Sequence, residues 1–170
     1  MERTLIVFKP DAVQRGIVGE IISRFEKVGL KIVAMKMLAP DREHYHHHYE
    51  TISKMISRRG QKQFEYTLKL VSSGPVIAVV LEGIEAVAQV RKMVGGTDPK
   101  VAAPGTIRGD FAHVGLDHVN DSKLGLPNII HASGDPEEAA LEIEHWFKPA
   151  ELHSYKLSDE HYTQPMPDKN

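Results

Sequence analysis

His131 and Glu142 are the two residues whose types and spacing most directly suggest catalysis. A short buried strand, Asn128 to Ile130, is expected to deliver the histidine at its end. Asp135 is the expected N-cap of a helix from Glu137 to Phe147, which carries the glutamate. A carboxylate that holds one imidazole nitrogen as N–H leaves the other with a free lone pair, which activates a histidine nucleophile. The alternative at this point is a hydrogen-bonded core histidine with no catalytic role.

Three cationic residues lie at positions from which they could bind an anion in a buried site. Lys9 follows an apolar strand, Arg91 lies near the end of a helix, and Arg108 lies in a segment rich in glycine and proline. Together with Thr97 and Asn128 they form a set suited to binding a polyphosphate beside a nucleophile, because cations and rigid donors stabilise phosphoryl oxygens. The chain contains no GxxxxGK(S/T) motif, which excludes a P-loop enzyme.

Four apolar or alternating runs predict strands, and stretches with helical spacing separate them. The strands are expected at Thr4 to Phe8, Lys31 to Leu38, Val76 to Leu81 and Asn128 to Ile130. The helices are expected at Gly19 to Val28, after Pro40, and at Ile52 to Ser57, Gln63 to Val71, Ile84 to Val94 and Glu137 to Phe147. This order predicts an α+β sandwich with helices on one face of an antiparallel sheet.

The composition is that of one globular domain: 170 residues, of which 41% are hydrophobic and 26% charged. A formal net charge of −2 gives no general argument for binding nucleic acid or a membrane surface. The absence of cysteine excludes disulfides, thiol catalysis and cysteine-ligated zinc, and is compatible with a cytoplasmic protein. We expect no signal peptide and no membrane span, because the first residues enter a strand directly and no run of about 18 apolar residues exists.

His44 and His48 are four positions apart on an expected helix, a spacing that can bind a metal ion. A metal site needs further ligands, so we interpret this histidine-rich stretch as a polar helix face. No metal-ligating residue is therefore predicted.

Several sequence blocks, in a fixed order, resemble the nucleoside diphosphate kinases from Glu2 to about Tyr155. The blocks are Glu2–Thr4 with Lys9–Asp11, Val13–Gly16 with Val18–Ile22, Ser73–Val76, Pro104–Phe111, Asn128–Ser133, and Trp146–Pro149 with Glu151–Leu152. The resemblance implies a ferredoxin-like sandwich, with a four-stranded antiparallel sheet covered by helices. It also implies a homo-oligomer, either a hexamer or a tetramer, and ping-pong transfer of the γ-phosphoryl group from a nucleoside triphosphate to a nucleoside diphosphate.

The resemblance also implies roles for individual residues. His131 matches the nucleophile, Glu142 the carboxylate that orients its ring, Ser133 a hydrogen-bonded neighbour, and Tyr49 a tyrosine near the reacting phosphate. Magnesium is expected to bind mainly through the nucleotide phosphates. The implied nucleotide-binding residues are Lys9, Phe64, Arg91, Thr97, Arg108 and Asn128, with Lys9 and Asn128 holding the ribose hydroxyls and Lys9 also reaching phosphate.

Three departures from the family pattern are visible. The base-stacking phenylalanine is usually one of two adjacent phenylalanines, and the matching pair here is Gln63-Phe64, so the stack uses Phe64 or is rearranged. Extra residues lie near 52–63 and in 115–127, and the second insertion is expected to be a surface loop that shapes the base pocket or an oligomer contact. Ala132 replaces the glycine that usually follows the nucleophile.

The expected organisation is a single domain over residues 1–155 and a tail over residues 156–170. Two rival functions remain at this stage. A ferredoxin-like RNA-binding module is suggested by Arg108 to Val114, which faintly resembles a basic–glycine–aromatic RNA-contact string, although aromatics are only 6% of the chain. A catalytically silent scaffold is the second rival. The presence of all the candidate site residues from Lys9 to Glu142 argues against it, because a scaffold does not require them.

Overall fold

The computed structural model describes residues 1–158 and 160–162, and these residues form a four-stranded sheet. Its strands are β1 (Glu2–Phe8), β2 (Lys31–Leu38), β3 (Val76–Gly83) and β4 (Ile130–Ala132), in the order β2-β3-β1-β4. Every neighbouring pair is antiparallel. This order and direction confirm the predicted ferredoxin-like α+β fold.

Helices make up the connections between the strands. Between β1 and β2 lie α1 (Pro10–Gln14) and α2 (Val18–Lys27). Between β2 and β3 lie α3 (Arg42–His46), the π-helix η1 (His47–Ile52), α4 (Met55–Arg59) and α5 (Gln61–Val71). Between β3 and β4 lie α6 (Ala86–Val94), the 3-10 helix η2 (Pro99–Val101), α7 (Ile107–Phe111) and α8 (Leu116–Ser122). After β4 come α9 (Pro136–Trp146) and the 3-10 helices η3 (Pro149–Glu151) and η4 (Glu160–Tyr162).

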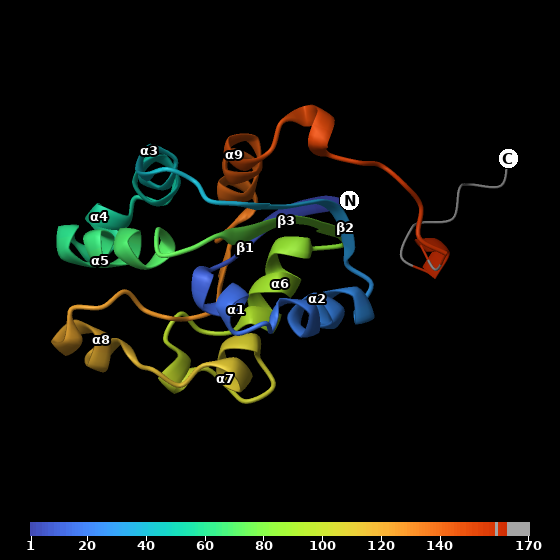
Figure 1. Ribbon diagram of the computed structural model, residues 1–170. Helices are drawn as coiled ribbons and strands as arrows, with labels where there is room; N and C mark the ends of the chain where they lie inside the picture. Colours follow the sequence, from blue (N-terminus) through green and yellow to red (C-terminus); the bar gives the residue numbers. More distant parts are fainter. Residues whose placement is uncertain (159, 163–170) are drawn as a thin grey trace, which may run out of the picture.

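Helices cover both faces of the sheet, with α3 and α9 on one side and α1, α2 and α6 on the other (Figure 1). The expectation that helices cover one face only is therefore wrong. Its cause lies in the alternation along β1, because Leu5 and Val7 pack into one hydrophobic core and Ile6 and Phe8 into a second. A sheet that is apolar on both faces needs cover on both.

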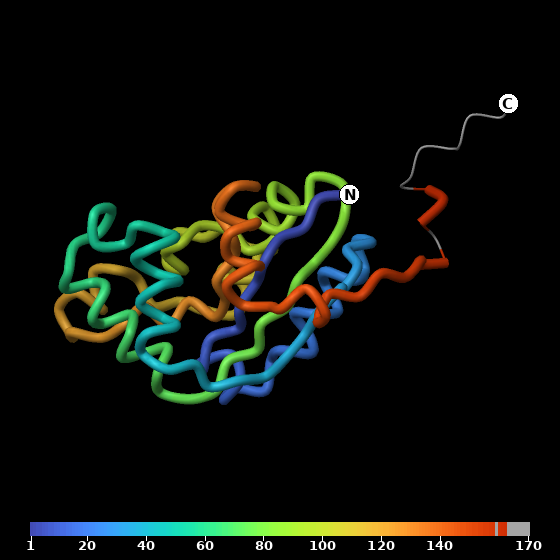
Figure 2. The backbone as a smooth tube through the Cα atoms, turned by 90° about the horizontal axis from the view of Figure 1, so that it is seen from above, coloured from blue at the N-terminus to red at the C-terminus, as the bar shows by residue number. Residues whose placement is uncertain are grey.

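The segment 115–127, expected as a surface loop, contains helix α8, and Val119 in this helix is fully buried. Both views place the segment beside α5 (Figures 1 and 2), where Gln63 donates a hydrogen bond to Asn120. Gly125 packs so closely on α5 that an added Cβ atom would lie 2.5 Å from the carbonyl oxygen of Tyr66. A single buried side chain in a short helix produces no helical periodicity, so the sequence pattern pointed to a loop.

The chain after α9 runs along β2, at the edge of the sheet. The His153 amide donates to the Val33 carbonyl at 2.8 Å, and the Lys31 ammonium lies 2.8 Å from Glu82 and 3.1 Å from Glu160. Glu160 of the expected tail is thus held against the sheet, whereas Thr163 to Asn170 lie outside the described residues. No described helix has the length and apolar character that crossing a membrane requires.

Candidate active site

β4 places His131 on the face of the sheet covered by α9 and η1. The strand begins at Ile130, later than the sequence suggested, and pairs His131 with Val7 of β1. Ile130 and Ala132 belong to the core on the opposite face, so the histidine between them is directed away from that core. Its side chain keeps 15% of its area exposed and lines a cavity.

A strained turn immediately before β4 fixes the direction of this strand. Ile129 is fully buried and has a φ of 72°, in the left-handed region that a β-branched residue rarely adopts. The turn is closed by a hydrogen bond of 2.8 Å from the Ile130 amide to the Asn128 carbonyl. The Ile129 amide donates to the Asp11 carboxylate at 3.0 Å, and the Ile129 carbonyl accepts from the Lys9 amide at 2.9 Å. These bonds hold strain beside the candidate nucleophile, as is common at functional sites.

Glu142 reaches His131 from α9, as the sequence suggested. Asp135 caps this helix by accepting from the Glu138 amide at 2.8 Å. Glu142 is fully buried, with Oε1 2.8 Å from His131 Nε2 and Oε2 accepting from the Ser133 hydroxyl at 2.7 Å. Burial alone would raise the pKa of Glu142, but the charge and hydrogen bond of His131, with help from Ser133, lower it to about 2. The carboxylate is therefore ionised at neutral pH.

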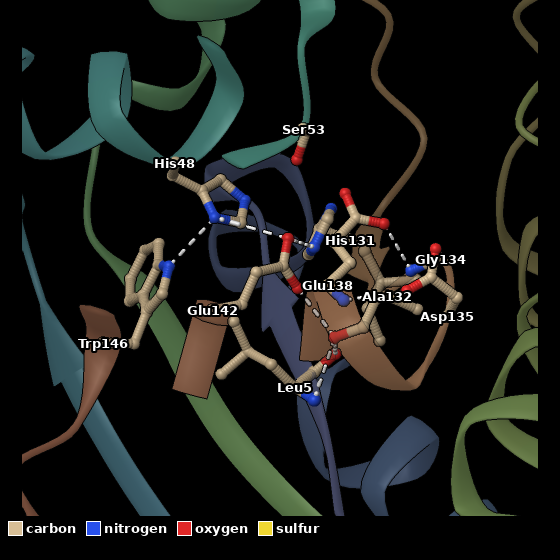
Figure 3. A network of polar contacts seen from close by, with 12 residues as sticks. Leu5, His48, Ser53, His131, Ala132, Gly134, Asp135, Glu138, Glu142 and Trp146 are labelled. Atoms are coloured by element: carbon tan, nitrogen blue, oxygen red, sulfur yellow. Dashed lines mark hydrogen bonds and ion pairs between the residues drawn. The ribbon is translucent and has the colours of Figure 1, made fainter. Parts of the chain in front are cut away.

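His48 completes this network and was not recognised from the sequence. It lies in the π-helix η1, is 1% exposed, and its Nδ1 accepts a hydrogen bond of 3.1 Å from the indole N–H of Trp146 (Figure 3). The same nitrogen lies 3.5 Å from Glu142 Oε1. Burial lowers the pKa of His48 well below its usual value, and the neighbouring His131 lowers it further, so His48 is neutral. Its spacing from His44 was the available signal, but it suggested a metal pair.

The histidines on α3 and η1 do not form that metal pair. His44 stacks on His145 of α9, with ring centroids 3.9 Å apart, whereas His48 points into the core. His48, His131 and Glu142 do have ligand atoms within 4.8 Å of one another. His131 Nε2 and Glu142 Oε1 already contact each other at 2.8 Å, and we assign no protein-held metal there.

A cavity of about 400 Å³ opens in front of His131. This size is sufficient for a small-molecule substrate. Most of the predicted site residues line it, namely Lys9, Tyr49, Arg91, Thr97, Arg108, Asn128 and His131. Two further cations of the lining, Arg58 and Arg59, come from α4 and were not singled out from the sequence. The cavity is therefore lined by the candidate nucleophile His131 and by five cationic side chains.

Lys9 and Asn128 form one polar unit on the cavity wall. The Lys9 ammonium donates to Asn128 Oδ1 at 2.6 Å, and Asn128 Nδ2 donates to the Thr97 carbonyl at 2.8 Å. Burial lowers the pKa of Lys9 to about 8, and Arg108 and Arg59 add to that effect while Asp11 opposes it. Lys9 is thus a strong donor whose charge depends on pH in the mildly alkaline range.

Arg108 is 5% exposed and binds chiefly to the backbone. Its guanidinium donates to the carbonyls of Asn128 at 3.2 Å, Gly95 at 3.0 Å and Ile130 at 2.6 Å. It therefore ties α7 to the turn that precedes His131. Arg91 is exposed, and its guanidinium donates to the Ala132 carbonyl at 3.5 Å.

Comparison with known proteins identifies the family. A model of the nucleoside diphosphate kinase family matches residues 2–152. The chain belongs to the nucleoside diphosphate kinase family. It is 50% identical over 165 residues to the nucleoside diphosphate kinase of Pyrococcus furiosus, covering 96% of this chain and 94% of the relative. It is 42% identical over 164 residues to the nucleoside diphosphate kinase of Borreliella burgdorferi, covering 95% of this chain and 98% of the relative.

Solved structures of nucleoside diphosphate kinases share this fold. A transition-state mimic of the Borrelia burgdorferi enzyme with bound vanadate and ADP superposes with a TM-score of 0.92 at 41% identity, covering 95% of this chain and 96% of that one. A Halobacterium salinarum enzyme in complex with CDP gives a TM-score of 0.82 at 36% identity, covering 96% of this chain and 99% of that one.

Phe64 is not among the residues that line the cavity. It is 2% exposed, belongs to the core beneath α5, and packs edge-on against His46 with ring centroids 5.4 Å apart. The described cavity is lined on this side by Met55 and Leu126 instead. Because α5 turns this side chain into the core, the structure favours the second alternative, a rearranged stack, and the role of Phe64 stays a prediction.

The RNA-binding alternative is also contradicted by the structure. Its motif would place the basic and aromatic residues of Arg108 to Val114 on an exposed strand. In this structure, residues 107–111 instead form helix α7, and Arg108 is buried. The segment therefore offers no stacking platform on the sheet.

Proposed function

We propose that this chain transfers the γ-phosphoryl group of a nucleoside triphosphate to a nucleoside diphosphate through a phosphohistidine on His131. The observation that carries this proposal is the 2.8 Å contact between the buried Glu142 carboxylate and His131 Nε2, at the base of a cationic cavity. With Nε2 facing the carboxylate, Nδ1 is the ring nitrogen left to attack phosphorus.

The first half-reaction forms one bond and breaks one. The Nδ1 lone pair of neutral His131 forms the N–P bond, while the bond from the γ-phosphorus to the bridging oxygen breaks and its electron pair leaves with the nucleoside diphosphate. The proton on Nε2 stays there, and its growing positive charge is stabilised by Glu142, which Ser133 holds in place through a 2.7 Å hydrogen bond. A second nucleoside diphosphate then takes the phosphoryl group by the reverse step.

The remaining predicted residues have proposed roles in binding. Arg91, Thr97 and Arg108 contact the phosphates, and Lys9 with Asn128 holds the ribose hydroxyls, with Lys9 also reaching phosphate. Tyr49 is 9% exposed, and burial raises the pKa of its phenol, so it remains a hydrogen-bond donor beside His131. The support for these assignments is that all six side chains line the cavity in front of the nucleophile.

We further propose that the nucleotide enters with Mg²⁺ bound to its phosphates. Two carboxylates line the cavity, Asp135 and Glu138, and each has one oxygen engaged with a backbone amide, so at most their free oxygens could reach the ion's water shell. The ion would neutralise charge on the β- and γ-phosphates.

A homo-oligomer, either a hexamer or a tetramer, and a cytoplasmic location complete the proposal. Met35 and Met37 on the edge strand β2 are 55% and 58% exposed, which supports self-association through an apolar surface. The cytoplasmic location is supported by the proposed nucleotide substrates, and no nucleic acid partner is required. Native mass spectrometry distinguishes the two assemblies from a monomer.

The test of the function is direct detection of the phosphoenzyme. Incubation with ATP and Mg²⁺ should produce an acid-labile phosphoryl group on His131, which intact-protein and peptide mass spectrometry detect. His131→Ala should abolish both this product and phosphoryl exchange with a nucleoside diphosphate. The control is His153→Ala, which removes an exposed histidine of the C-terminal segment. Normal exchange in His131→Ala would refute the proposed function.

A further inference from the structure

Trp146 and His48 form a buried pair behind the carboxylate of Glu142. Trp146, on α9, is 3% exposed, and His48, on η1, is 1% exposed. The indole N–H donates to His48 Nδ1 at 3.1 Å. The His48 ring contacts Trp146 on one side, and Glu142 and His131 on the other (Figure 3). Neither Trp146 nor His48 lines the cavity, so any effect of the pair on the reaction has to pass through Glu142 or His131.

The hydrogen bond from Trp146 fixes which nitrogen of His48 carries the proton. An indole nitrogen only donates, so Nδ1 has to accept with its lone pair. Burial lowers the pKa of His48 well below its usual value, so the ring carries a single proton, and this proton is on Nε2. Among residues 1–158 and 160–162, Nε2 has no hydrogen-bond partner. Trp146 thus imposes a tautomer whose N–H has no acceptor in this part of the chain.

The other tautomer would give His48 a better hydrogen bond but would weaken the action of Glu142. His48 Nδ1 lies 3.5 Å from Glu142 Oε1, so a proton on Nδ1 could enter a charge-assisted hydrogen bond to this oxygen. The same oxygen contacts His131 Nε2 at 2.8 Å, while Ser133 donates to Oε2. A second donor on Oε1 would draw negative charge away from His131 and leave less to stabilise the positive charge that grows on its ring. With the Trp146 bond in place, His48 offers the carboxylate a lone pair instead of a proton.

We propose that Trp146 and His48 are positioning residues that reserve Glu142 Oε1 for His131, because Trp146 holds the proton of His48 on Nε2. The inference rests on the proposed function, since it takes His131 as the nucleophile. In the simpler role, in which the bond only packs α9 against η1, the reaction would not depend on the His48 tautomer. Trp146→Phe separates the two roles. It keeps an aromatic ring in the core and removes the N–H, so the proton of His48 becomes free to move to Nδ1 and donate to Glu142.

The first experiment determines the tautomer without reference to activity. Magic-angle-spinning NMR of the full chain, with isotopically labelled histidine nitrogens, distinguishes a protonated from an unprotonated ring nitrogen. In the parent protein, His48 should show an unprotonated Nδ1 and a protonated Nε2. In Trp146→Phe, the proton should be on Nδ1. The chain has ten histidines, and the signals of His48 are assigned by their loss in the double variant His48→Phe/Trp146→Phe.

The second experiment measures the consequence for the reaction, as the rate of His131 phosphorylation at saturating ATP. Trp146→Phe should phosphorylate about tenfold more slowly, the effect of weakening one charge-assisted hydrogen bond, and should bind ADP like the parent protein. The double variant has no N–H in place of His48 Nδ1, so it should recover most of the lost rate. Phe147→Leu is the matched control and should react like the parent, because it trims a buried ring of the same core without removing a side-chain hydrogen bond.

Two results would overturn the inference. The first is a proton on Nδ1 of His48 in the parent protein, and this measurement needs no variant, so it decides even if Trp146→Phe does not fold. The second is equal slowing in Trp146→Phe and in the double variant, since Trp146 would then act through packing alone. Phosphorylation of His131 in the parent protein is measured in the same preparation. Its absence would refute the proposed function, whereas its presence together with either of the two results would refute the role of the Trp146–His48 pair alone.

Discussion

Replacing Glu142 by glutamine tests how the buried carboxylate acts on the nucleophile. The substitution keeps the size and an oxygen acceptor but removes the charge 2.8 Å from His131 Nε2. At this separation a full ion pair is worth about 6 kcal/mol with an effective dielectric constant of about 20. If about half a unit of positive charge develops on the imidazole as the N–P bond forms, the loss is ~3 kcal/mol, or on the order of 100-fold in rate.

Rapid-quench measurement of His131 phosphorylation at saturating ATP reports this step directly, and calorimetry with ADP reports affinity. Glu142→Gln should phosphorylate on the order of 100-fold more slowly and bind ADP almost as well as the parent, because only the stabilisation of the transition state is lost. Glu144→Gln, which changes an exposed residue of the same helix, is the matched control. A rate equal to that of the control, or an equal loss of ADP affinity, would contradict the proposed role of Glu142.

Two further predictions concern the cations of the cavity. Because the pKa of Lys9 is lowered to about 8, this lysine loses its proton as the pH rises through that value, and ADP affinity should fall in parallel. Calorimetry in two buffers should then show that protons are taken up when ADP binds, and Lys9→Met should abolish this uptake. An ADP affinity that does not change with pH would contradict the role of Lys9. Arg108→Ala should lower the unfolding free energy by about 3 kcal/mol, because it leaves buried carbonyls without donors. An unchanged denaturation midpoint would show that Arg108 does not stabilise the fold and acts only in binding the ligand.

The proximity of the proposed catalytic residues was predictable from the sequence because they are close in the chain. His131 lies in β4, Ser133 directly follows that strand and Glu142 lies in the next helix, whose start is fixed by the cap at Asp135. The spacing of these residues therefore determined their proximity. The four strands were also predictable in kind, since apolar runs of strand length in this order permit few arrangements.

The base side of the site was not predictable, because its residues depend on contacts between distant segments. Periodicity shows that α5 has an apolar face but does not show that Phe64 belongs to it. The positions of Arg59 and His48 depend on two irregular elements, the π-helix η1 and the left-handed residue Lys54. Neither irregularity has a signature in the sequence, and both arise where tertiary packing overrides local preference.

The hydrogen bond between Trp146 and His48 has an optical consequence. Trp146 is the single tryptophan of the chain, and its indole N–H ends 3.1 Å from a histidine whose ring centroid is 4.5 Å from that of His131. Any charge placed on His131 therefore changes the electric field at the one indole chromophore. If His131 is phosphorylated as proposed, the ultraviolet emission of Trp146 should therefore change in each half-reaction, and the reaction could be followed without a label.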